Sequence, residues 1–110
     1  MKLPNADRAI IDIRKLSTYC LDLEHSDGQH KARVFRSALG IGLEDVDELR
    51  RALLKAILTS EAIPTQQDRH GQRYVVDFLM TRLDKQAIVR SAWIIRTTEN
   101  FPRLVTCYIP

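Results

Sequence analysis

The sequence predicts an α+β domain in which about three N-terminal helices pack on a C-terminal antiparallel sheet of three to four strands. Two observations predict this class. Apolar residues repeat at a spacing of three to four up to about residue 57, and they alternate after Pro64. Helices therefore precede strands along the chain, which is typical of an α+β fold rather than of a parallel sheet with intervening helices.

The first expected helix covers about residues 12–21, with Asp12 as a plausible N-cap. Its apolar stripe consists of Ile13, Leu16, Cys20 and Leu23. The stretch EHSDGQ, residues 24–29, then interrupts the helical pattern, because Ser-Asp-Gly is typical turn chemistry.

A second helix is expected to begin near His30 or Lys31 and to end at Gly40, where glycine suits the left-handed position after a helix. A third is expected from about Glu44. Acidic residues crowd its first turns, where the helix dipole favours them. The two apolar stripes comprise Ala32, Phe35, Ala38 and Leu39, then Val46, Leu49, Leu53, Ala56 and Ile57.

Three alternating segments follow, with expected turns at residues 68–71 and 82–85. The segment 61–67 is an expected edge strand, since Pro64 suits an edge. Alternation places Arg90 and Arg96 on one face, and it groups Arg103 with Val105, Cys107 and Ile109. The expected core contains Leu16, Cys20, Phe35, Leu39, Leu49, Leu53, Val76, Phe78, Trp93 and Ile95.

The 110 residues fit one domain spanning residues 1–110. No apolar run is long enough to cross a membrane, and the first residues lack the apolar region of a signal peptide. We therefore expect a cytoplasmic protein without membrane contact. The two cysteines, Cys20 and Cys107, match no metal spacing and are expected to be reduced, buried thiols. Neither a metal nor an organic cofactor is expected.

The net charge of +3 is unevenly distributed. Residues 1–40 contain seven basic and five acidic residues, residues 41–70 contain four and six, and residues 71–110 contain six and three. Basic ends around an acidic middle indicate an anionic partner or an ordinary solvated surface, and charge alone does not separate the two.

Two regions far apart in sequence carry the candidate site. One is the loop and helix start with His25, Gly28, His30 and Lys31. The other is the sheet, with Arg90, Arg96, Arg103 and Thr106. Metal-free RNA cleavage needs a base, an acid and cations that stabilise the charged phosphorane, and histidine, lysine and arginine supply these. The alternative is that these polar residues are merely exposed on a loop and a sheet.

Three stretches together resemble an uncharacterised bacterial domain family that occurs as small free-standing proteins and as C-terminal domains of polymorphic toxins. They are EHSDGQHKARVFRSALGI, GQRYVVDF and RSAWIIR…FPRLVTCYIP. The expected family pattern has a proline after the histidine, whereas this chain has Ser26 after His25. The resemblance implies a fold similar to the barnase, EndoU and RelE-like ribonuclease toxins, and a small cognate antitoxin as partner.

The leading hypothesis is therefore a metal-independent endoribonuclease of a toxin–antitoxin pair that binds RNA. His25 is the expected general base or acid, Lys31 and Arg103 are the expected phosphate stabilisers, and Thr106 is an expected substrate contact. His30, Arg90 and Arg96 are further candidates for substrate binding. A non-enzymatic binding or regulatory module, antitoxin-like in character, is the alternative, and an exposed strand edge leaves a homodimer open.

Overall fold

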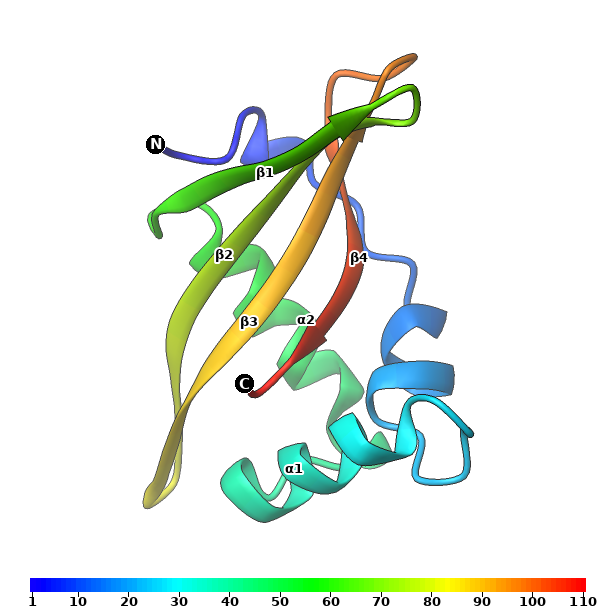
Figure 1. Ribbon diagram of the computed structural model, residues 1–110. Coiled ribbons are helices and arrows are strands. Elements are labelled where there is room, and N and C mark those ends of the chain that lie inside the picture. The colour runs from blue at the N-terminus through cyan, green and yellow to red at the C-terminus, as the bar shows by residue number, and fades with distance from the viewer.

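In the computed structural model, which describes residues 1–110, the helices lie on one side of a four-stranded antiparallel sheet (Figure 1). The sheet has the order β1-β2-β3-β4, so each strand pairs with its neighbour in sequence. The strands are β1 (Ala62–Asp68), β2 (Gly71–Arg82), β3 (Lys85–Arg96) and β4 (Pro102–Tyr108). The predicted α+β class, with helices first and the sheet last, is confirmed.

The helical part contains two α-helices and three short segments. These are η1 (Ala6–Arg8), η2 (Leu16–Cys20), α1 (Gln29–Leu39), η3 (Leu43–Asp45) and α2 (Val46–Ala56). The helix α2 runs behind the sheet, α1 lies near its lower end, and the blue segment containing η2 lies beside β4 (Figure 1). None of these helices is both long and apolar enough to cross a membrane.

The first predicted helix differs from the α-helix expected over residues 12–21. The segment η2 is a π-helix, in which the N–H of Leu21 donates to the carbonyl of Leu16 at 2.9 Å. This five-residue spacing buries Leu21 together with Leu16 and Cys20, while Ile13 and Leu23 remain 38% and 40% exposed. The predicted apolar stripe was therefore wrong at Ile13 and Leu23. It assumed an α-helix, whose hydrogen bonds join residues four apart, whereas those of a π-helix join residues five apart.

The second and third predicted helices are confirmed, and one arginine joins them to the sheet. The helix α1 ends at Gly40, which has a φ of 67°. The guanidinium of Arg82, at the end of β2, donates to the carbonyl oxygens of Leu39 and Gly40. It also donates to the carboxylates of Asp45 and Glu48, both at 2.9 Å. Arg82 thus joins the end of α1 to the start of α2.

Both predicted turns and the edge strand are confirmed. Asp68 pairs with Gly71 across the first turn, and Arg82 pairs with Lys85 across the second. The strand β1 carries Pro64 and an irregularity in register between Pro64 and Gln67. Both features are common devices that keep an edge strand from pairing with other chains.

The last strand contains a bulge that the alternation did not predict. Ala92 pairs with Thr106, but Trp93 pairs with Leu104, so Val105 has no partner on β3. The extra residue reverses the side-chain alternation, because Leu104 and Cys107 are both buried. The prediction that Arg103 and Cys107 share a face was therefore wrong.

The core lies between the sheet and the helical layer. Of the ten predicted core residues, eight are buried, while Phe78 and Ile95 are partly buried and pack against the others. Trp93 is fully buried, as expected. Its indole N–H donates to the hydroxyl of Ser91 at 2.9 Å, and that hydroxyl donates to the carbonyl of Val76 at 2.8 Å.

Replacing Ser91 by Ala should lower the free energy of unfolding by about 1–3 kcal/mol, because the buried indole N–H loses its acceptor. Denaturant unfolding followed by the fluorescence of Trp93, the sole tryptophan, measures this change. Ser37→Ala, at an exposed position of α1, is the matched control and should change little. Equal stabilities of the two variants would show that the Ser91 network does not stabilise the core.

Candidate functional site

The loop before α1 is held against η2 by a close backbone approach at Gly28. A Cβ atom at this position would lie 2.1 Å from the carbonyl oxygen of Tyr19. The φ of Gly28 is −84°, so the glycine is required by space and not by backbone conformation. The loop residue His25 is consequently fixed next to the side chain of Tyr19, with the two ring centroids 5.0 Å apart and edge to face.

His25 has a defined hydrogen-bonding state. Its Nδ1 accepts hydrogen bonds from the backbone N–H groups of Asp27 and Gly28, both at 3.0 Å. Since backbone N–H groups can only donate, Nδ1 must carry a lone pair and the neutral ring carries its proton on Nε2. His25 therefore presents a donor, and it can become a general base only if the ring releases these two amides.

Lys31 is brought to the same place by Tyr19. Its Nζ donates to the Tyr19 Oη at 2.9 Å and lies 4.8 Å from the centroid of that ring. A second ring, that of Tyr108 on β4, lies 5.6 Å away. The hydrogen bond to Tyr19 raises the pKa of Lys31, so its charge is present throughout the neutral range. His25 and Lys31 thus both contact Tyr19, which brings the two side chains to one place.

Behind this cluster, two buried thiols join η2 to β4. The Sγ of Cys20 lies 3.6 Å from the Oγ1 of Thr106, and both Cys20 and Cys107 are reduced and fully buried. A hydrogen bond from Cys107 lowers the pKa of Cys20 to about 6, against the opposing effect of burial, and Thr106 and Lys31 act in the same direction. The same pairing, together with burial, raises the pKa of Cys107.

A hollow of about 670 Å³ opens over this cluster. It is lined by Asp12, Arg14, Lys15, Thr18, Tyr19, His25, Val105 and Thr106. A smaller hollow of about 150 Å³ is lined by Ile10, Asp12, Lys15, Ile94, Arg96, Arg103, Leu104 and Val105. The two share Asp12, Lys15 and Val105, and together they form what we call the β4 groove. The groove exists because the chain from Ile10 to Cys20 follows the edge of β4.

The predicted catalytic residues Arg103 and Thr106 line the two parts of this groove. The Arg103 guanidinium binds the carboxylate of Glu99 through two nitrogens, at 2.8 and 2.9 Å. This pairing raises the pKa of Arg103 and lowers that of Glu99. Arg103 is therefore a partly neutralised cation, whereas Lys15, which lines both hollows, makes no ion pair.

The predicted substrate-binding residues are divided by the fold. Arg96 lines the smaller hollow. Arg90 lies on the same outer face of the sheet, outside the groove, where it pairs with Asp77 through two nitrogens at 2.9 Å. His30 is exposed on the first turn of α1 and lines neither hollow.

Six polar residues of this region were missed by sequence reasoning: Asp12, Arg14, Lys15 and Thr18 as groove residues, and Tyr19 and Tyr108 as the rings beside Lys31. Tyr19 precedes the buried Cys20, so an expected helix with Cys20 inward leaves this phenol near the surface and close to the His25 loop. The sequence around Lys15 does not indicate a place in the groove, because Lys15 reaches the groove only through the path of residues 10–20 along β4.

The β4 groove is suited to an anionic substrate. The Nε2–H of His25, the ammonium groups of Lys15 and Lys31 and the hydroxyl group of Thr106 are hydrogen-bond donors in or beside it. Asp12 is the acidic residue of the groove, and hydrogen bonds from Arg14 lower the pKa of this carboxyl to about 2. No group of three or more His, Cys, Asp or Glu side chains is placed to hold a metal ion.

The family described as "Domain of unknown function (DUF6883)" matches residues 2–110. Among solved structures, the fold is similar to that of a chain in the "Contact-dependent growth inhibition toxin - immunity protein complex from Klebsiella pneumoniae 342". The TM-score is 0.70 at 13% sequence identity, and the likeness covers 96% of each chain. A comparison with curated proteins finds no match.

The state of His25 is directly measurable. Nitrogen chemical shifts of the neutral ring should show Nε2 protonated and Nδ1 unprotonated, because two backbone amides donate to Nδ1. Exposed His30, which has no such acceptor role, serves as the internal reference for a ring exchanging between both forms. A His25 ring with its proton on Nδ1 would contradict the geometry of the loop.

Proposed function

This chain belongs to the DUF6883 family, and we propose that it is a toxin domain that cleaves RNA without a metal ion and is neutralised by a cognate protein partner. The observation that carries the proposal is the convergence of His25 and Lys31 on Tyr19, beside a groove whose wall includes Thr106. The likeness of the fold to a chain of a toxin–immunity complex supports a toxin-related role.

The chemistry we propose is attack of a ribose 2′-oxygen on the neighbouring phosphorus, which forms the 2′-oxygen–phosphorus bond and breaks the bond to the 5′-oxygen. The proton of the 2′-hydroxyl passes to water, and the departing 5′-oxygen takes a proton from water. Negative charge accumulates on the phosphoryl oxygens in the transition state, where preorganised donors act most strongly. The Lys31 and Lys15 ammonium groups and the His25 Nε2–H would supply these donors, and Thr106 would hold the phosphate. Arg103 and Arg96 would bind the adjacent phosphate in the smaller hollow.

Within this proposal His25 acts as a hydrogen-bond donor to the phosphate in the conformation observed. General-base action by His25 would require its ring to turn and leave the amides of Asp27 and Gly28. Lys31 is placed to contribute more, because its charge is held between two aromatic rings and does not depend on the protonation of the histidine.

A second candidate is an immunity-type binding module with no catalytic activity. It is favoured by the same structural likeness, because the similar fold occurs in a complex that contains both a toxin and its immunity protein. Expression separates the two functions. Growth arrest that a cognate protein relieves supports the toxin, whereas protection of cells from a toxin without growth arrest supports the binding module.

Replacing Lys31 by Ala should reduce RNA cleavage by about ten-fold or more, since removal of one charge-stabilising donor typically costs ~10²-fold. Cleavage of total cellular RNA by the purified protein, in the presence of a chelator, measures the rate. Lys31→Ala should leave the fold intact, because the ammonium lies at the start of α1, where its charge opposes the helix dipole.

The matched control is Arg36→Ala, on the exposed side of the same helix, which should cleave at nearly the wild-type rate. A folded Lys31→Ala variant with full activity would contradict the proposed site. Absence of any cleavage by the wild-type protein would contradict the ribonuclease proposal and would favour the binding module.

A further inference from the structure

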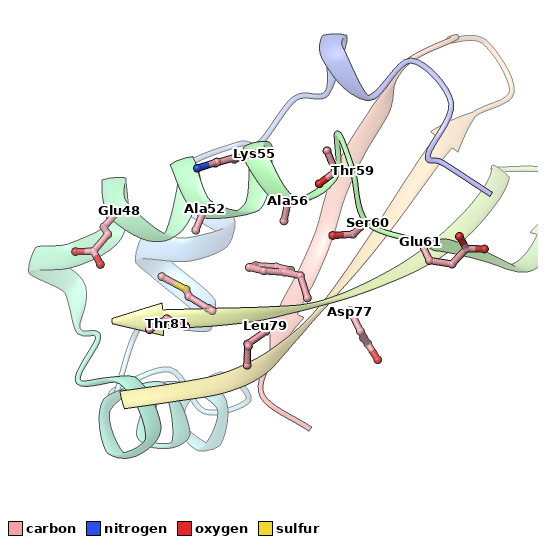
Figure 2. Close-up of a pocket in the computed structure, with 12 residues that line it drawn as sticks. Glu48, Ala52, Lys55, Ala56, Thr59, Ser60, Glu61, Asp77, Leu79 and Thr81 are labelled. Atoms are coloured by element: carbon pink, nitrogen blue, oxygen red, sulfur yellow. The ribbon is translucent and has the colours of Figure 1, made fainter. Parts of the chain in front are cut away.

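A third hollow, of about 720 Å³, lies between α2 and the second half of β2 (Figure 2). It is at the edge of the sheet that is farther from β4. Five consecutive strand residues border it, from Asp77 to Thr81. Side chains on a strand alternate between faces, so five neighbours can border one hollow only if it runs along the backbone edge. In Figure 2, Asp77 and Leu79 point away from α2, whereas Ala52 and Ala56 face the strand.

This edge is open because β1 is shorter than β2. The pairing of β1 with β2 ends at Ala62 and Val76, so the residues from Asp77 to Arg82 have a strand neighbour only on the β3 side. The six residues span about 20 Å at ~3.3 Å per residue, which is the length of an average strand. An edge of unpaired N–H and C=O groups is recognised by another extended backbone.

The other two edges of the sheet are protected. The strand β1 carries Pro64 and an irregular register. The edge of β4 is covered by the chain at Ile10, whose N–H donates to Pro102 and whose carbonyl accepts from Leu104, and beyond this point η2 packs beside it. Between Asp77 and Arg82 there is no proline, no lysine and no register shift. This part of the edge therefore carries neither the proline nor the irregular register of β1, and no chain pairs with it as residue Ile10 pairs with β4; only α2 stands over its inner face.

We propose that the edge from Asp77 to Arg82 binds an extended segment of a second, different protein, which adds to the sheet beside β2 in line with β1. Inward side chains of that segment enter the hollow against Ala52, Ala56 and Met80, and outward ones lie beside Leu79, which is 57% exposed. This edge would be the place where the cognate partner of the proposed function binds, so the proposal rests on that function for the partner alone. Binding at the edge does not depend on RNA cleavage.

The position of α2 favours a different protein over a second copy of this chain. The helix contributes Glu48, Ala52, Lys55 and Ala56 to the wall of the hollow, so it stands over the open edge. A second copy that paired antiparallel through the same edge would bring its own α2 to the same face of the joined sheet, where the two helices would compete for one space. A hairpin or terminal strand without a helix on that face meets no such conflict.

The probe is a display library of linear peptides of about twelve residues, long enough to span the edge. It is selected for binding to the full-length protein. The expected result is enrichment of peptides with alternating apolar residues, together with slower hydrogen exchange of the amides between Asp77 and Arg82 when peptide is bound. Slowed exchange at these amides is the signature of an added strand.

Two variants test the site. Leu79→Lys combined with Thr81→Lys introduces edge lysines, and Ala56→Trp fills the hollow without changing the strand; each should weaken peptide binding by about ten-fold or more. Ile63→Lys on β1 is the matched control, because Ile63 is 59% exposed and lies outside the open edge, and it should leave binding unchanged.

Ile88→Lys tests the outer face of the sheet, since Ile88 pairs with Leu79 from the central strand β3. Loss of binding in this variant but not in Ala56→Trp would overturn the proposal in favour of a face contact. Failure to enrich any peptide that depends on Leu79 or Ala56 would also overturn it, as would a wild-type homodimer in sedimentation that the edge lysines dissociate. None of these outcomes depends on ribonuclease activity, so they do not decide the proposed function.

Discussion

Burial of η2 against β4 is the constraint on which the arrangement of the candidate site depends. Leu16 and Cys20 are fully buried, and the π-helical turn allows Leu21 to be buried with them. This fixes Tyr19, whose carbonyl oxygen leaves no room for a side chain at position 28 and so holds the loop of His25. The hydroxyl of the same tyrosine binds Lys31. Tyr19 therefore positions both His25 and Lys31, and it does so from η2, a helix of five residues.

The bulge at Val105 is the second constraint, because it decides which residues of β4 face the helices. Leu104 and Cys107 both reach the core, which a regular strand would not allow for residues separated by three positions. Thr106 then lies beside Cys20, and Val105 borders both hollows of the groove. Bulges frequently redirect side chains next to functional sites, and this one places the groove residues Val105 and Thr106 between the core residues Leu104 and Cys107.

Much of the fold follows from local pattern. The change of period near Pro64 predicts helices before strands, Gly40 predicts the end of α1, and the two turns predict the hairpins. These features depend on interactions between residues close in sequence, which is why a single sequence reveals them. The π-helix and the bulge depend instead on hydrogen-bond register, and a shift of one residue in register leaves the hydrophobic composition unchanged.

In the candidate site, too, features set by neighbouring residues could be predicted, and features set by long-range contacts could not. The Ser-Asp-Gly turn before α1 indicates that His25 and Lys31 approach each other, and the geometry adds that Tyr19 is their common contact. Asp12 and Lys15 could not be assigned to the groove, because the path of residues 10–20 along β4 is a long-range property of the fold. Arg90 and Arg103 were recognised as basic strand residues, but their pairing with Asp77 and Glu99 depends on cross-strand and loop contacts.

We propose that the β4 groove binds RNA at the cluster around Tyr19. Titration of the protein with a 2′-O-methyl oligoribonucleotide, which lacks the attacking hydroxyl and cannot be cleaved, tests it by backbone chemical-shift changes. The largest changes should occur at Tyr19, His25, Lys31, Val105 and Thr106, and they should weaken as salt rises, because salt ions compete for the phosphates. Changes confined to the open edge of β2, or absent at low salt, would contradict it.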